Sequence, residues 1–251
     1  VLLYAHHDVQ PVGDINLWKT DPFTPEMIDG RLFGRGSGDD KSGVVIHYNV
    51  IKQLKSEFPV NIKVFIEGEE EIGSPTMSSF IEQNREALEA DVIVIADSGN
   101  VKIGVPTVTT TLRGLADGII EVDQPMRPIH SGVGGGVVPD AFMVLSKIIA
   151  SFHDEKGNLM IEGLTPTDMQ VTELEESFLK KMLGSEEIHL FDTESISKRL
   201  WLEPALDVLA IDAPAVKDAV NLVIPKAKAK VSLRLPPTED PEHAMKMLEE
   251  H

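Results

Sequence analysis

Four glutamates within five residues, Glu67, Glu69, Glu70 and Glu71, directly follow the apolar segment Asn61–Ile66. This segment predicts a buried β-strand, so the carboxylates would be held together in the loop where the strand ends. Two like charges about 4 Å apart repel by about 4 kcal/mol at an effective dielectric constant near 20. Protons or cations would relieve this repulsion, whereas a solvated acidic turn would avoid it. The run alone leaves both interpretations open.

Two further apolar segments end beside residues of the same chemical kind. Val1–Ala5 predicts a buried strand followed by His6 and Asp8, and Asp91–Ala96 predicts another strand followed by Asp97. Taken alone, a His-x-Asp sequence is more often a surface turn than a metal ligand beside an orienting acid. Helical patterns at 44–54 and 75–89 separate the strands, which is typical of an α/β domain with a mostly parallel sheet and helices on both faces. Parallel strands bring their carboxyl ends to one edge, where such sheets bind ligands.

A glycine-rich segment, Arg31–Gly43, adds Asp39 and Asp40 immediately before the helical pattern at 44–54. A helix N-terminus favours negative charge, and N-capping would explain one of the two aspartates. The glycines lack the spacing of a dinucleotide-binding or P-loop motif. Together with the acids at the strand ends, this combination of His, Asp and Glu suits a pair of divalent ions such as zinc or manganese.

Composition narrows the possible partners and sites. The 251 residues include no cysteine, which excludes disulfides and thiolate metal sites. The net charge of -18 argues against nucleic acid and anionic membrane surfaces as partners, and no apolar run is long enough for a transmembrane helix. The absence of cysteine agrees with a cytoplasmic location.

The second half of the sequence changes in character. Strands are predicted at 107–112, 114–122 and 226–235, a helix at 138–152, and another helix beginning at Pro241. We therefore expect a small α+β domain at 112–251 after an α/β domain at 1–111. The chain begins inside a predicted strand and stops inside a predicted helix, so we expect a fragment of a longer protein in which the α/β domain continues beyond residue 251.

Short motifs in both halves share one order along the chain. They are Tyr4–Pro11, Gly34–Lys41, Glu70–Ser74, Asp97, Leu112–Gly114, His130–Gly132 and Ser232–Arg234. In this order they resemble the dinuclear zinc metallopeptidase family of carnosinases, non-specific dipeptidases, glutamate carboxypeptidases and amino-acid deacylases. The first two motifs indicate the dipeptidase and carnosinase branch. The resemblance implies a phosphorylase/hydrolase-like catalytic domain with an inserted ferredoxin-like lid and dimerisation domain.

The resemblance assigns roles to the acidic residues and to the first histidine. The metal ligands would be His6, Asp39, Glu71 and Asp97. Asp39 would bridge the two ions, and the Asp39–Asp40 peptide bond would be cis. The ions would be zinc, with manganese or cobalt as alternatives. Two further residues would be catalytic, Asp8 by orienting the site and Glu70 as the general base. The family's last ligand, a histidine, would lie beyond residue 251.

The resemblance also assigns substrate-binding roles in the second domain. His130 would polarise the scissile carbonyl across a homodimer formed by the lid domains. Arg234 would pair with the substrate carboxylate, since the guanidinium fork suits carboxylates, and Asn221 would be a polar substrate contact. Asn221 as an ordinary turn residue and Arg234 as a surface strand residue stay open as alternatives.

The implied function is hydrolysis of the peptide bond in dipeptides or short peptides that have a free C-terminal carboxylate. One alternative is an amino-acid deacylase or desuccinylase that uses the same site. An alternative of another class is a non-catalytic metal-binding dimerisation protein, which would apply if the natural chain ended at His251.

Overall fold

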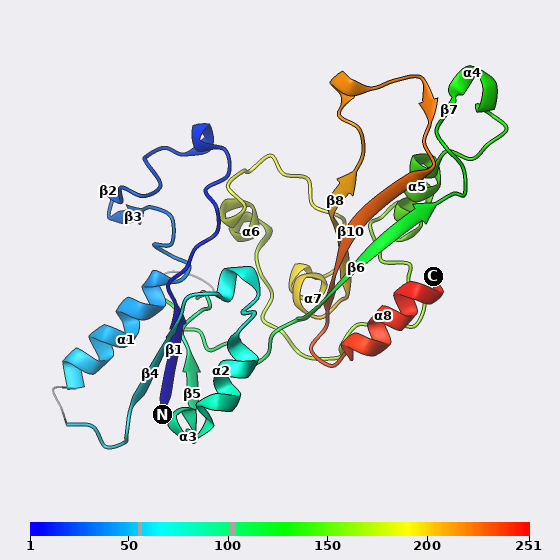
Figure 1. Cartoon of the computed structure of the whole chain (residues 1–251). Helices are drawn as coiled ribbons and strands as arrows, with labels where there is room; N and C mark the ends of the chain where they lie inside the picture. Colours follow the sequence, from blue (N-terminus) through cyan, green and yellow to red (C-terminus); the bar gives the residue numbers. More distant parts are fainter. Residues whose placement is uncertain (55–56, 101–103) are drawn as a thin grey trace. The chain divides into compact units, whose positions relative to one another are not determined.

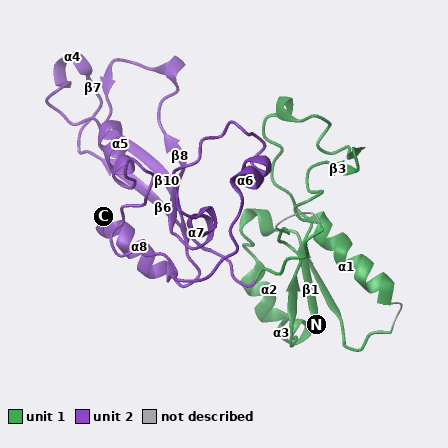
Figure 2. Ribbon diagram, turned by 180° about the vertical axis from the view of Figure 1, so that it is seen from behind, with its two compact units in different colours: residues 1–109 green, residues 110–251 purple. Residues whose placement is uncertain are grey.

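The computed structural model describes residues 1–54, 57–100 and 104–251. The chain divides into two compact units, residues 1–109 and residues 110–251 (Figure 2). The boundary expected from the sequence, between residues 111 and 112, lies two residues further along. Each unit has its own sheet, and each is described by itself.

A three-stranded parallel sheet forms the centre of the first unit (Figure 1). β1 (Leu2–His6) lies between β4 (Lys63–Glu67) and β5 (Ile93–Ile95), and the register places Leu3 beside both Val64 and Val94. All three strands therefore end at the same edge of the sheet. The sequence prediction of a parallel α/β arrangement is confirmed for this unit.

Helices cover both faces of this sheet (Figure 1). On one face, Nε2 of His47 in α1 lies 2.8 Å from the carbonyl oxygen of Tyr4. On the other, the ring of Phe80 in α2 stacks on Phe65 with centroids 5.4 Å apart. The helices are α1 (Lys41–Leu54), α2 (Met77–Gln83) and α3 (Arg85–Leu88), and the small elements are a 3-10 turn (Ile15–Leu17) and the hairpin β2 (Glu26–Ile28) and β3 (Arg31–Phe33).

Two sequence predictions near this unit are wrong. The single helix expected at 75–89 is broken at Asn84, whose φ of -119° and ψ of 19° leave the helical region. The strand expected at 107–112 is absent, and Val108 and Leu112 are 85% and 73% exposed. The division between the units falls inside this segment, and no described strand pairs with it.

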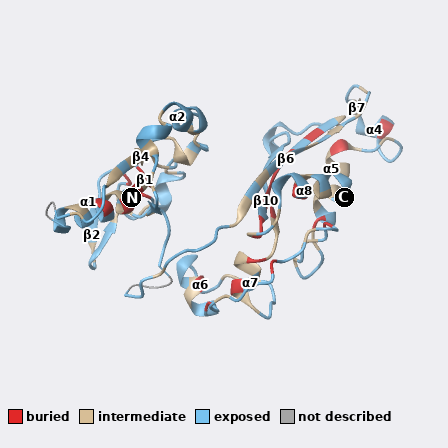
Figure 3. Ribbon diagram, turned by 90° about the horizontal axis from the view of Figure 1, so that it is seen from below, coloured by how far each residue is buried: buried red, intermediate tan, exposed pale blue. Residues whose placement is uncertain are grey.

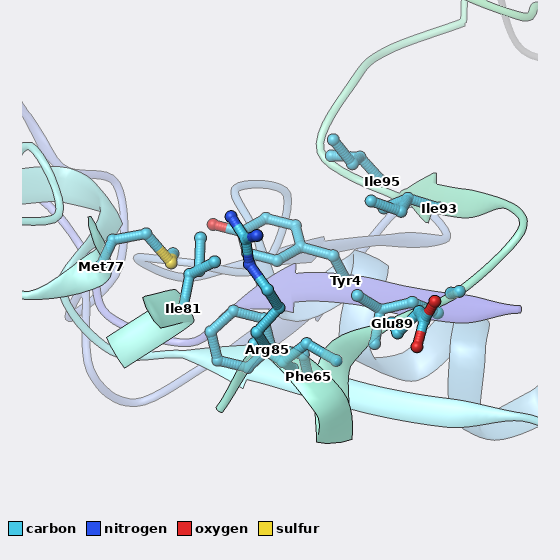
Figure 4. Close-up of a pocket in the computed structure, with 11 residues that line it drawn as sticks. Tyr4, Phe65, Met77, Ile81, Arg85, Glu89, Ile93 and Ile95 are labelled. Carbon is cyan, nitrogen blue, oxygen red and sulfur yellow. The ribbon is translucent and has the colours of Figure 1, made fainter. Parts of the chain in front are cut away.

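An apolar cavity of about 670 Å³ lies on the face of this sheet that carries α2 and α3 (Figure 4). Tyr4, Phe65, Ile81 and Ile95 form part of its wall, and the view also labels two charged residues of the lining, Arg85 and Glu89. None of the acids at the strand ends lines it. The cavity is therefore separate from the site that the sequence predicts.

A three-stranded antiparallel sheet forms the centre of the second unit, with β10 (Lys226–Leu235) between β6 (Gly114–Asp123) and β8 (Ala205–Asp212). β10 alternates buried and exposed residues, as the sequence predicts, until a register shift between Lys230 and Val231. β8 was not predicted.

The core of the second unit lies under one face of β10, which Figure 3 shows as a buried stripe along that strand. Val231, Leu233 and Leu235 pack with Phe152 and Ala244, which come from the end of α5 and from α8. The helix expected at 138–152 is observed as α5 (Ala141–Ser151), and the expected final helix is α8 (Pro241–Glu250). The α+β expectation is confirmed in outline.

The remaining elements of the second unit are short. They are β7 (Ile129–His130), α4 (Ser131–Gly134), α6 (Glu176–Met182), α7 (Ile196–Trp201), a 3-10 turn (Val216–Asp218) and β9 (Leu222–Val223). Within the described residues, no helix combines the length and apolar character needed to cross a membrane.

Candidate metal centre

The carboxyl edge of the parallel sheet collects the acidic residues of the first unit. His6 is the last residue of β1, and Asp8 follows it. Glu70 and Glu71 begin a 3-10 turn just after β4, and Asp97 follows β5. The parallel strands thus bring together residues that lie up to 91 positions apart, as the sequence predicts.

His6 lies at the centre of this group, and its side chain is fully buried. Its Nε2 atom lies 3.0 Å from Oδ1 of Asp39, and 3.8 Å from both Oε2 of Glu70 and Oδ1 of Asp97. Three carboxylates thus surround one ring nitrogen. Asp39, at 70% exposed, leaves the group open to solvent on its side.

The other ring nitrogen of His6 is occupied by Asp8. Nδ1 lies 3.2 Å from the carbonyl oxygen of Asp8 and 3.4 Å from its Oδ1 atom. A proton on Nδ1 can be donated to these oxygens of Asp8. In the neutral ring, the lone pair of Nε2 then faces the carboxylates. A lone pair facing carboxylates is unfavourable unless a proton or a metal ion lies between them. Such an orientation of a histidine by a second residue is typical of metal sites.

Glu71 is held in place by two residues of the segment after β1. The backbone N–H of Gln10 donates to Oε1 of Glu71 (3.2 Å), and the side-chain amide of Gln10 donates to Oε2 of Glu71 (2.8 Å). The backbone N–H of Glu71 donates to Oδ2 of Asp8 (2.9 Å). These contacts fix the turn that carries Glu70 and Glu71. Gln10 belongs to the first sequence motif, but no role was predicted for it.

Asp39 and Asp40 are joined by a cis peptide bond, as the resemblance implies. Asp40 is almost fully buried, and it accepts hydrogen bonds from the backbone N–H groups of His6 (3.1 Å) and Gly43 (3.1 Å). A Cβ atom at Gly43 would lie 2.3 Å from the carbonyl oxygen of Ala96, so glycine lets α1 approach the segment before Asp97. The roles of Asp40 and Gly43 were not predicted.

Burial and mutual repulsion change the acidity of the group. Burial, followed by the charges of Asp97, Glu71 and Asp39, raises the pKa of Glu70, although His6 opposes this. Burial also raises the pKa of Asp97, with Asp40 as the largest neighbouring charge. Burial lowers the pKa of His6, but the surrounding carboxylates outweigh it and the net change is upward. Each shift shows that the group favours an added positive charge.

The donor set fits divalent metal ions. There are two sets of possible ligand atoms, and within each set the atoms lie within 4.8 Å of one another. Both sets contain His6: one adds Asp39 and Glu71, and the other adds Asp40 and Asp97. Nitrogen and carboxylate oxygen donors without sulfur suit zinc, manganese and related ions. The four residues predicted as ligands are therefore brought together, and the second set contains Asp40, which was not predicted.

In the second unit, the structure brings His130 and Asn221 together. β7 pairs with β9, and the N–H of Ser131 donates to the carbonyl oxygen of Asn221 (2.9 Å). Nδ1 of His130 accepts from the N–H of Gly132 (3.0 Å). The proton of the neutral ring therefore sits on Nε2, which is left as a hydrogen-bond donor on an exposed side chain.

Arg234 lies near the other end of β10, in the three-stranded sheet of this unit. The end of β10 near Lys226 adjoins the His130 region, because Ile224 accepts a hydrogen bond from the N–H of Ala141 and Val223 pairs with Ile129. Arg234 is eight residues along β10 from Lys226, which is roughly 26 Å at about 3.3 Å per residue. The predicted substrate residues of this unit therefore form two separate groups.

Comparison with known proteins identifies the family. The profile described as "Peptidase family M20/M25/M40" matches residues 2–250. The chain belongs to this peptidase family. Among curated M20 relatives, the cysteinylglycine-S-conjugate dipeptidase of Corynebacterium striatum is 37% identical over the whole chain and 56% of its own length. The mouse Beta-Ala-His dipeptidase is 31% identical over the whole chain and 54% of its own length.

Two solved structures also resemble this chain. A metallo-carboxypeptidase from Sulfolobus solfataricus matches the whole chain with a TM-score of 0.82 and 31% identity, covering 60% of its own length. Human carnosine dipeptidase 1 matches with a TM-score of 0.75 and 28% identity, covering 56% of its own length. The chain thus spans about half the length of the curated relatives that it matches.

Proposed function

We propose that the full-length protein is a metal-dependent dipeptidase that hydrolyses dipeptides or short peptides with a free C-terminal carboxylate. The observation that carries the proposal is the buried His6, whose Nε2 atom faces the carboxylates of Asp39, Glu70 and Asp97. The named functions of the M20 relatives support the substrate class. They favour peptides over the N-acyl amino acids of a deacylase.

His6, Asp39, Glu71 and Asp97 would hold two divalent ions, for which we propose zinc, with manganese or cobalt able to replace it. When bound, such ions polarise water and stabilise negative charge. Asp8 holds the proton of His6 on Nδ1 and keeps Nε2 free as a ligand. Glu70 is the general base: its raised pKa suits a carboxylate that takes a proton from water near neutral pH and returns it to the leaving amine.

The substrate residues of the second unit would act from two copies of the chain. About 26 Å of β10 separates Arg234 from the region of His130 and Asn221, whereas an extended dipeptide spans only about 7 Å. One copy therefore cannot place both groups on one dipeptide. A homodimer solves this if Arg234 of one copy binds the substrate carboxylate while His130 of the other donates from Nε2 to the scissile carbonyl. Asn221 would contact the substrate beside His130.

Replacement of the base tests the proposal in the full-length protein. Glu70→Ala should retain the metal content found by elemental analysis but lose turnover of a dipeptide panel, because proton transfer of this kind contributes about 10²–10⁴-fold. Glu69→Gln is the matched control: Glu69 accepts hydrogen bonds from Thr76 and lies outside the metal ligand sets. It should keep most activity. Full activity of Glu70→Ala would refute the base assignment, and preference for N-acyl amino acids would refute the substrate class.

A further inference from the structure

Gln10 contacts the metal centre from its rim, and the proposed mechanism gives this residue no role. It makes three hydrogen bonds to one residue, Glu71. The backbone N–H of Gln10 donates to Oε1 (3.2 Å), and its side-chain nitrogen donates both to Oε2 (2.8 Å) and to the backbone carbonyl oxygen (2.9 Å). These contacts join the segment after β1 to the turn after β4.

The neighbours of the Gln10 side chain determine which way its amide group points. The two groups within hydrogen-bond distance of its nitrogen are the carboxylate and the carbonyl oxygen of Glu71, and both are acceptors. If the amide were turned over, its oxygen would face two acceptors and both hydrogen bonds would be lost. Gln10 therefore acts as a donor to Glu71.

These hydrogen bonds leave room for a metal ion on Glu71. An ionised carboxylate has about four lone-pair positions, and Gln10 occupies two of them, one on each oxygen. A carboxylate oxygen of Glu71 also lies within 4.8 Å of the ligand atoms of His6 and Asp39. Glu71 can therefore bind an ion and accept from Gln10 at the same time.

Gln10 holds the carboxylate of Glu71 where its own charge disfavours it. Asp39 offers an oxygen within 4.8 Å of one of Glu71, and like charges at this range repel. Glu71 is only partly buried, so rotation into solvent would relieve the repulsion and recover side-chain conformational entropy. The hydrogen bond from the N–H of Glu71 to Asp8 fixes the main chain of the turn. The hydrogen bonds from Gln10 fix the carboxylate itself.

The backbone that follows Gln10 is held by contacts that need no metal ion. Arg35 donates to the carbonyl oxygen of Pro11 (3.2 Å), and its guanidinium carbon lies 5.1 Å from the ring centroid of Trp18. Trp18 in turn donates from Nε1 to the carbonyl oxygen of Val12 (2.8 Å). The position of Gln10 is therefore set by the fold before an ion binds.

We infer that Gln10 is a positioning residue, which holds the carboxylate of Glu71 in place for a metal ion. This inference rests on the proposed function, because it takes Glu71 as a ligand, and it extends that function by a residue outside the ligand set. Loss of such an outer partner typically lowers metal affinity about 10–100-fold. Because Gln10 acts through Glu71, its effect should disappear when Glu71 no longer supplies a carboxylate.

Zinc affinity tests the inference without turnover. The metal-free 251-residue chain would be titrated with zinc in competition with a chromophoric chelator. Gln10→Met keeps the length of the side chain but has no donor, and it should raise the zinc dissociation constant about tenfold or more. Asn16→Leu is the matched control, because the amide of Asn16 also donates to a carboxylate, Oδ1 of Asp14 at 2.8 Å, which lies outside the ligand sets. It should bind zinc like the unaltered chain.

A double-mutant cycle separates positioning from a purely structural role. Glu71→Gln should weaken zinc binding by itself. Adding Gln10→Met to Glu71→Gln should then change the dissociation constant by less than about twofold. If Gln10 only stabilised the turn, its replacement would weaken zinc binding equally in both backgrounds. Circular dichroism would establish that each variant is folded.

The outcomes also separate this inference from the proposed function. An unaltered chain that takes up no zinc, an unchanged affinity of folded Gln10→Met, an equal loss in Asn16→Leu, or the same loss in the Glu71→Gln background would each overturn the inference. None of these results depends on whether the full-length protein hydrolyses dipeptides. If zinc binding follows the expected pattern but the full-length protein hydrolyses no peptide, the positioning role of Gln10 stands and the proposed function fails.

Discussion

The replacement Tyr4→Phe tests how the acidic edge of the first unit is built. The hydroxyl of Tyr4 donates to Oε2 of Glu67 at 2.5 Å, and Glu67 is only 6% exposed. A hydrogen bond to a charged group contributes about 1.5–3 kcal/mol, and a buried carboxylate left without its donor is costly in itself. Tyr4→Phe keeps the ring beside Phe65, at 5.7 Å between centroids. We therefore expect the first unit to lose about 2 kcal/mol of unfolding free energy.

The two tryptophans make this measurable, because Trp18 lies in the first unit and Trp201 in the second. In a Trp201→Phe background, urea unfolding followed by fluorescence reports the first unit alone. In a Glu67→Gln background the same replacement should cost only about 0.5–1.5 kcal/mol, as for a neutral hydrogen bond. An equal cost in both backgrounds would refute the charged hydrogen bond.

Tyr48→Phe is the control for loss of a tyrosine hydroxyl. The side chain of Tyr48 is 60% exposed, with Nζ of Lys52 5.7 Å from its ring centroid. Exposed substitutions of this kind usually change stability by less than about 0.5 kcal/mol. If Tyr4→Phe costs no more than Tyr48→Phe, the buried pair does not stabilise the unit.

Three further predictions use the same fluorescence assay. Zinc at 100 times its dissociation constant should stabilise the unit seen by Trp18 by about 2.7 kcal/mol, EDTA should abolish the gain, and Trp201 should report no change. Leu233→Ala should destabilise the second unit by about 2–5 kcal/mol, since Leu233 is fully buried in its core, with the Trp18 transition unchanged. A hydrogen bond from Lys230 lowers the pKa of Asp117, so the folded pKa lies below the unfolded value and the pair stabilises above about pH 4. Asp117→Asn should therefore cost about 0.2–1 kcal/mol at pH 7, and the cost should disappear as the pH falls below about 4.

The ends of the strands could be predicted because each signal is local. An apolar segment with His6, Glu70 or Asp97 just beyond it specifies both a strand and the chemical group near its end, and a parallel sheet converts three such ends into one edge. The difference between Asp39 and Asp40 is not local. Asp39 is 70% exposed and Asp40 is buried, because Asp40 accepts from the backbone of β1. No sequence pattern distinguishes these two neighbours.

The missed strand β8 has a physical cause in its pattern of exposure. Val208, Leu209 and Ile211 are all apolar and all exposed, so the segment shows no alternation of two faces. Its pairing with β10 also shifts register between Lys230 and Val231. Periodicity identifies a strand only when one face is consistently buried, and β8 does not meet this condition.

In both units, some charged side chains are paired with opposite charges and others are not. On the exposed face of β10, Lys226, Lys228 and Lys230 each have a carboxylate of β6 within 3.1 Å, and these pairs need no ligand. Arg234 is on the same strand, but among the residues that the structure describes no carboxylate lies as close to it. In the first unit, the carboxylates around His6 outnumber the neighbouring positive charges. The two imbalances have opposite signs. Under the function that we propose, divalent ions would balance the carboxylates around His6, and the C-terminal carboxylate of a peptide would balance Arg234.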